Sequence, residues 1–117
     1  YEAFPRLRER RRARGTVLSG GERQILSIAR VLRMGARLLL LDEPTEGLAP
    51  VLVQQLGGLI KDLRQRGATI LLIEQNLRFA MSVAERHYLL AQGAIVDVLN
   101  TAEVRAREHE LLAHLGV

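Results

Sequence analysis

Two short segments of the sequence combine residue types that suit phosphate chemistry. The first is Leu18-Ser19-Gly20-Gly21-Glu22, in which two glycines follow a serine at the expected start of a helix. Amides at a helix N-terminus carry partial positive charge, and glycines present them without a Cβ in the way. The Ser19 hydroxyl adds one more donor. This segment predicts a contact with a phosphate group; taken alone, an ordinary glycine-containing helix start is the alternative.

The second segment is an apolar run that ends in two neighbouring carboxylates, Asp42 and Glu43. Leucines fill positions 38–41, and Pro44 follows the two acids. In open α/β sheets, ligands bind beyond the carboxyl ends of the strands. Asp42 is suited there to hold Mg²⁺, directly or through water, and Glu43 to polarise an attacking water as a general base. An ordinary Asp- and Pro-containing turn is the alternative for this segment alone.

The hydrophobic pattern predicts an α/β architecture, because helical and strand-like segments alternate along the chain. A helix is expected over residues 22–34, with Ser19 and Glu22 forming a capping box at its start. The runs at 37–41 and 68–73 are short, apolar and bounded by turn residues. They predict strands buried on both faces.

The remaining elements are predicted from local signals. Pro50 is expected at the first position of a helix, and Asn76 as the cap of a short one. Gln92-Gly93 is expected to join the strands of a β-hairpin. One helix is expected from Thr101 onward. The chain has no repeat or linker and is interpreted as one domain.

The composition bounds the class of protein. Hydrophobic residues make up 48% of the 117 residues and charged residues 26%, which is typical of a folded domain and not of a disordered chain. No apolar run approaches the roughly 18 residues that span a bilayer. There is no cysteine, so disulfides and thiolate metal sites are excluded. The first residues, 1–5, have no initiator methionine or signal core, which suggests a cut through a longer chain.

The net charge is +4, and the excess basic charge is concentrated at the N-terminal end. The arginines in this cluster are Arg6, Arg8, Arg10, Arg11, Arg12 and Arg14. Such a cluster can attract nucleic acid or anionic lipid. Nucleic-acid binding is disfavoured, because no aromatic residue is interleaved to stack on bases. His87, His109 and His114 lack the spacing of a helical metal site, and we interpret them as surface or packing residues.

In order and separation, residues 18–24 and 38–43 resemble the signature motif and the Walker B strand of the ATP-binding cassette (ABC) ATPases. The subfamily that the chain resembles is that of the branched-chain amino acid importers. The segments that carry this likeness are 4–10, 43–50, 73–76 and 92–96. The resemblance covers essentially the whole chain.

The resemblance implies a fold and its subdivision. The fold would be the C-terminal half of an ABC-type P-loop NTPase domain, α/β in class, with a mostly parallel sheet, flanking helices and a C-terminal β-hairpin. Residues 1–35 would be part of the helical subdomain with the signature motif, and 36–99 the Walker B and switch strands with the hairpin. Residues 100–117 would form the C-terminal helix.

The resemblance also implies roles for individual residues. The residues expected to contact ATP that is bound mainly by the opposite subunit of a dimer are Leu18, Ser19, Gly20, Gly21 and Glu22. Asp42 would serve Mg²⁺, and Glu43 the hydrolytic water. Gln75 stands where most ABC ATPases have a histidine that contacts the γ-phosphate, and an amide can still donate a hydrogen bond. Ala49 stands where the family usually has an aspartate.

The implied function is that of an ATP-binding subunit that couples ATP hydrolysis to uptake of branched-chain or related amino acids. Its cofactors would be ATP and Mg²⁺. Its partners would be a second ATPase subunit, identical or not, and membrane permease subunits, with no nucleic acid. It would be peripheral to the cytoplasmic face of the inner or plasma membrane. Two alternatives are a soluble ABC ATPase of DNA repair or translation, and a truncated, non-catalytic interaction module.

One motif of the family is missing from these 117 residues. No Gly-x-x-x-x-Gly-Lys-Ser/Thr stretch exists, and Lys61, the only lysine, lies in the middle of an expected helix. We therefore expect the isolated chain to be unable to hydrolyse ATP. In the family's sheet, the strand leading to that loop lies between the strands expected at 68–73 and 87–91. Its absence would leave unpaired strand edges, so self-association of the isolated chain is expected.

Overall fold

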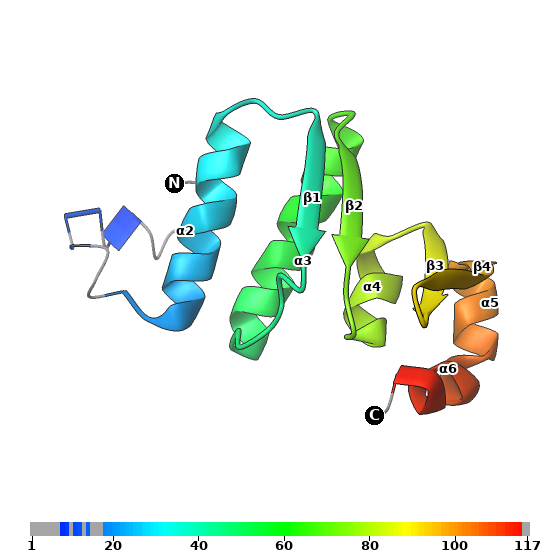
Figure 1. Cartoon of the computed structure of the whole chain (residues 1–117). Helices are drawn as coiled ribbons and strands as arrows, with labels where there is room; N and C mark the ends of the chain where they lie inside the picture. The colour runs from blue at the N-terminus through cyan, green and yellow to red at the C-terminus, as the bar shows by residue number, and fades with distance from the viewer. Residues whose placement is uncertain (1–7, 10, 13, 15–17, 116–117) are drawn as a thin grey trace. The chain divides into compact units, whose positions relative to one another are not determined.

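The computed structural model describes residues 8–9, 11–12, 14 and 18–115 (Figure 1). Residues 4–7 and 10 of the opening segment 4–10 lie outside the described residues, and so do Arg6 and Arg10 of the arginine cluster. Contacts divide the chain into two compact units, Tyr1–Ile73 and Glu74–Val117. The described strands form two separate two-stranded sheets, one in each unit.

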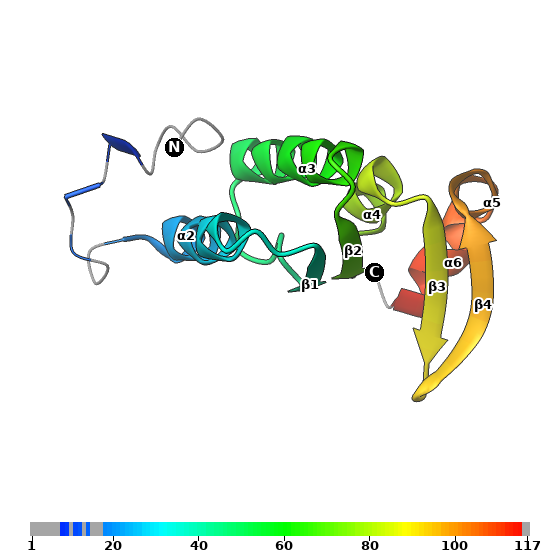
Figure 2. The same cartoon turned by 90° about the horizontal axis from the view of Figure 1, so that it is seen from above.

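The first unit is a strand–helix–strand crossover preceded by a helix. Its elements are α2 (Gly20–Arg33), β1 (Leu38–Asp42), α3 (Pro50–Gln65) and β2 (Thr69–Ile73). The strands are parallel, with pairs running from Leu38↔Thr69 to Asp42↔Ile73. Helix α3 runs along one face of this pair (Figures 1 and 2). Pro50 stands at its first turn, as the sequence predicts.

The core of the first unit is aliphatic. The apolar side chains that are buried there are Leu18, Ile25, Ile28, Leu39, Leu52, Leu56 and Ile60. Helices α2 and α3 supply most of them at helical spacing, and Leu39 is the fully buried side chain of β1.

The other face of this strand pair is open, so the prediction of strands buried on both faces is wrong for the described chain. Leu38 and Leu40 of β1 are 59% and 69% exposed, and Leu71 and Ile73 of β2 are each 54% exposed. Alternation along the strands puts all four on one face. Helix α3 covers only the opposite face, and no element described in this unit covers the open one.

The second unit is a hairpin packed against short helices. Its elements are α4 (Leu77–Val83), β3 (Arg86–Ala91), β4 (Ala94–Asn100), α5 (Thr101–Ala106) and α6 (Glu108–Leu115). The strands are antiparallel, and Gln92 and Gly93 both take positive φ between them, at 50° and 78°. Such a turn matches the twist of a hairpin and confirms its prediction. The buried core of this unit is Leu99, Val104 and Leu111.

The prediction of a single helix from Thr101 onward is wrong, because the structure has two helices there, α5 and α6, separated at Arg107. The Arg107 guanidinium donates to Asp97 of β4 at 2.6 Å and to both carboxylate oxygens of Glu110, at 2.9 and 2.8 Å. The bond from Arg107 holds the pKa of Asp97 below its usual value. Arg107 therefore stands between the two helices and ties the hairpin to α6, a contact that helical periodicity does not indicate.

None of the described helices is long and apolar enough to cross a membrane.

Candidate functional site

Helix α2 begins with a capping box, which confirms the prediction made from Ser19 and Glu22. The amide of Ser19 donates to Glu22 Oε2 at 2.8 Å, and the amide of Glu22 donates to Ser19 Oγ at 3.2 Å. The Arg23 guanidinium donates to the carbonyl of buried Leu18 at 3.1 Å and fixes the residue before the cap. These bonds hold the turn that carries the glycines before any ligand arrives.

The two glycines of this turn occupy different surroundings. A Cβ added at Gly20 would meet nothing within 4 Å, whereas one at Gly21 would lie 3.2 Å from both Leu48 Cδ2 and Leu52 Cδ1. Gly21 therefore lets α2 pack against the start of α3 and the loop before it. Gly20 instead has open space where a Cβ would stand, and as the first residue of α2 its amide has no carbonyl partner within the helix. An anion can approach the helix end at Gly20.

At the other candidate segment, β1 ends at two acids with different backbones. Asp42 is exposed and has strand geometry, in register with Ile73. Glu43 is half-buried and has a φ of 43°, in the left-handed region. Its amide donates to the Ile73 carbonyl at 2.9 Å. A turn follows over Pro44 and Thr45, both buried. The conformation of Glu43 is a feature that the sequence analysis missed.

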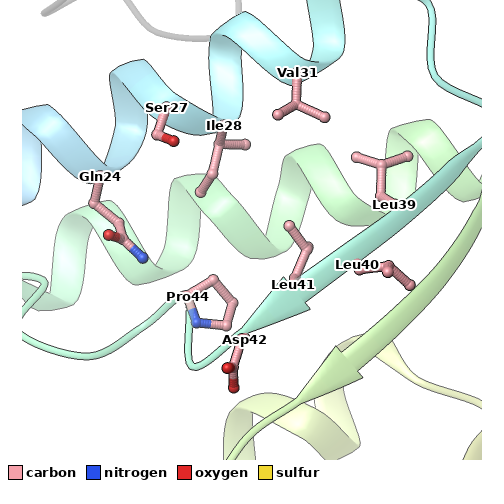
Figure 3. A pocket seen from close by; sticks show the side chains of 9 residues that line it. All are labelled: Gln24, Ser27, Ile28, Val31, Leu39, Leu40, Leu41, Asp42 and Pro44. Atoms are coloured by element: carbon pink, nitrogen blue, oxygen red, sulfur yellow. The ribbon is translucent and has the colours of Figure 1, made fainter.

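A mostly apolar pocket of about 170 Å³ lies between α2 and β1, as Figure 3 shows. The residues that line it are Gln24, Ser27, Ile28, Val31, Leu39, Leu40, Leu41, Asp42 and Pro44. Asp42 stands at the end of the strand, and Gln24 and Ser27 supply polar groups from the helix (Figure 3). The Asp42 carboxylate itself points away from Gln24 and Ser27 of α2 (Figure 3). An exposed carboxylate is one of the oxygen ligands that Mg²⁺ prefers.

Gln75 belongs to the second unit, where it is exposed and precedes the cap of α4. The cap is Asn76, whose Oδ1 accepts from the Phe79 amide at 3.1 Å, as predicted. The Asn76 amide donates to Glu74 Oε2 at 3.1 Å. The segment after β2 is therefore ordered by the residues on both sides of Gln75.

The chain is similar in sequence to known ATP-binding proteins of transporters. The family model described as ABC transporter matches residues 3–46. The branched-chain amino acid transport ATP-binding protein BraG of Pseudomonas aeruginosa is 50% identical over 95 residues, 81% of this chain and 41% of that protein. The probable LivF of Archaeoglobus fulgidus is 39% identical over 93% of this chain and 46% of its own. LptB of Escherichia coli K12, named for lipopolysaccharide export, is 36% identical over 87% of this chain and 42% of that protein.

The chain thus spans less than half the length of the curated relatives it matches. Two solved structures share its fold. The ATP-binding cassette MJ1267 in its ADP conformation has a TM-score of 0.74 at 23% identity, over 97% of this chain and 47% of that one. The dimeric cassette MJ0796 bound to ADP and Pi has a TM-score of 0.69 at 26% identity, over 75% of this chain and 38% of that one. These matches confirm the predicted fold class.

Proposed function

We propose that this chain, which belongs to the ABC transporter family, is the C-terminal part of an ATP-binding subunit that drives uptake of branched-chain or related amino acids. The support for the substrate class is the 50% identity to BraG, against 36–40% for the LptB proteins. The name of LivF points to the same class.

In this proposal the start of α2 contacts the γ-phosphate of ATP held mainly by a second ATPase subunit. The observation that carries it is the pre-formed turn, in which Ser19 and Glu22 cap one another and Gly20 faces open space. The Ser19 oxygen already accepts from the Glu22 amide, so its own hydrogen stays available for a phosphate oxygen. Leu18, Gly21 and Glu22 hold the turn through packing and the cap.

The two acids at the end of β1 would divide the chemistry of hydrolysis. Asp42 would hold Mg²⁺, and the bound ion would supply positive charge beside the phosphates. Glu43 accepts a proton from the water that attacks the γ-phosphorus, and ADP and inorganic phosphate leave. Gln75 donates its side-chain amide to the γ-phosphate in place of the histidine that most family members use.

The assembly that follows is a dimer of ATPase subunits, identical or not, docked on membrane permease subunits at the cytoplasmic face. The MJ0796 dimer bound to ADP and Pi supports the dimer. The phosphate-binding loop would be supplied by a part of the complete subunit outside these 117 residues. We therefore expect the isolated chain to release no phosphate from ATP above a Glu43→Gln control.

The test of the phosphate contact uses two glycines in the complete subunit. Gly20 and Gly58 are both exposed helical glycines, and an added Cβ meets nothing within 4 Å at either. Gly20→Ala should lower kcat/KM for ATP by roughly tenfold to a hundredfold, because a methyl would stand between the amides and the phosphate. Gly58→Ala should leave kcat/KM unchanged and stabilise α3 by about 1 kcal/mol. Equal ATPase activity of the two variants would contradict the proposal.

A further inference from the structure

The backbone of Glu43 departs from the conformation that its neighbours favour. Its φ of 43° is in the left-handed region, where an L side chain is strained. The following residue is Pro44, which favours extended geometry in the residue before it. Among the described residues, Gln92 is the other non-glycine with positive φ, and its hairpin turn requires that conformation. No such turn explains Glu43.

Backbone hydrogen bonds lie on both sides of Glu43. Its amide donates to the Ile73 carbonyl at 2.9 Å, and this is the last hydrogen bond of the parallel β1–β2 ladder, belonging to the pair Asp42↔Ile73. Its carbonyl accepts from the Glu46 amide at 3.1 Å, which closes the turn over Pro44. Strained conformations persist only where the surroundings determine them fully, and such sites cluster where function requires them.

The strain changes where the side chain of residue 43 can lie. If β1 continued, alternation would place residue 43 on the side of Leu39 and Leu41, the face that α3 covers. A carboxylate there would lose hydration. The left-handed turn takes Glu43 out of that alternation, and the residue is half-buried instead. In Figure 3 the strand ends at Asp42 and the chain has turned away by Pro44.

We propose that Ile73 is a positioning residue for ATP hydrolysis, acting through its carbonyl on the backbone of Glu43. Ile73 is 54% exposed, and its carbonyl is the group that the Glu43 amide contacts. The end of β2 thereby determines where the proposed general base stands. The inference rests on the proposed function of Glu43.

The test removes one hydrogen bond without altering a side chain. In the complete subunit, Glu43 is replaced by its α-hydroxy acid, so that an ester oxygen replaces the amide that donates to Ile73. The matched control is the same change at Thr69, whose amide donates to the Arg37 carbonyl at 2.8 Å at the other end of the ladder. The ester at 43 should lower kcat at least about tenfold with little change in KM for ATP. The ester at 69 should keep kcat within about twofold. Equal kcat values for the two esters would overturn the inference.

Two further variants separate this inference from the function it rests on. If Glu43→Gln keeps full ATPase activity, the proposed function fails. If Glu43→Gln is inactive while both esters behave alike, only the role of Ile73 fails. Independently of activity, Glu43→Gly should unfold at a higher temperature than Glu43→Ala, because glycine adopts positive φ freely. The reverse order of melting temperatures would show that the left-handed conformation is not held in solution and would overturn the inference.

Discussion

The starts of α2 and α5 use the same capping device in the two units of the chain. Ser19 and Glu22 exchange hydrogen bonds of 2.8 and 3.2 Å, and Asn100 and Glu103 exchange bonds of 2.7 and 3.0 Å. The residues between them differ: Gly20-Gly21 in α2, Thr101-Ala102 in α5.

This difference decides what each helix start can do. In α2, the first position has no side chain and open space beside it. In α5, the first position is Thr101, whose hydroxyl donates to the Ala84 carbonyl at 3.0 Å and pairs with His87 at 3.1 Å. A capping box alone therefore stabilises the start of a helix and does not indicate a ligand site. The glycines that follow it make one of the two helix starts a candidate ligand site.

The largest expected difference lies at the second helical position. Gly21→Val should destabilise the chain by roughly 1–3 kcal/mol, because its Cβ would stand 3.2 Å from Leu48 and Leu52. Ala102→Val, at the matching exposed position of α5, should cost about 0.5 kcal/mol through helix propensity. Urea unfolding followed by circular dichroism measures both. Equal losses would mean that α2 does not pack on α3 as described.

A smaller change should affect both starts alike in stability and only one in ligand binding. Ser19→Ala and Asn100→Ala each remove the side-chain half of a capping box and should each cost about 1 kcal/mol. In the complete subunit, only Ser19→Ala should weaken ATP-dependent dimerisation, measured by sedimentation. An equal effect of Asn100→Ala on dimerisation would remove the functional distinction between the two helices.

The smallest effect is a pH dependence confined to the α5 start. Thr101 donates to Ala84, so its oxygen accepts from Nε2 of half-buried His87. Burial lowers the pKa of His87 from its ordinary value near 6.5. Its contribution to stability is then complete above about pH 6.5 and is lost as the pH falls below that value.

The measurement compares melting temperatures at pH 7.5 and 5.5 for the parent chain and His87→Gln, whose amide can donate to Thr101 in the same way. The parent should lose more stability on acidification than the variant. An identical pH response of the two proteins would show that another group is responsible.

Signals carried by neighbouring residues were predictable from the sequence. The Ser19–Glu22 cap, Pro50 at the start of α3 and the Gln92-Gly93 turn depend on residues within four positions of one another, and the structure confirms them. The Asn100–Glu103 capping box has the same spacing as the first and was missed, although the sequence contains its signal.

Features that depend on distant contacts were not predictable. The bond from Arg107 to Asp97 and the bond from the Glu43 amide to the Ile73 carbonyl each join residues that are far apart in the sequence. The residue types of the candidate site could be identified from the sequence, because Ser19, Gly20 and Gly21 are consecutive, as are Asp42 and Glu43. The packing role of Gly21 was not, because Leu48 and Leu52 reach it only in the folded chain.

The pairings of the two sheets also imply an order of folding. The hairpin joins strands separated by Gln92 and Gly93 alone, whereas the β1–β2 register requires the whole of α3 to be placed first. Strands that are close in sequence pair quickly. Strands separated by a long segment pair slowly, because closing the loop costs conformational entropy before any stabilising contact forms. The segment with the two acids is made earlier on the ribosome than the hairpin, yet it should acquire its native pairing later.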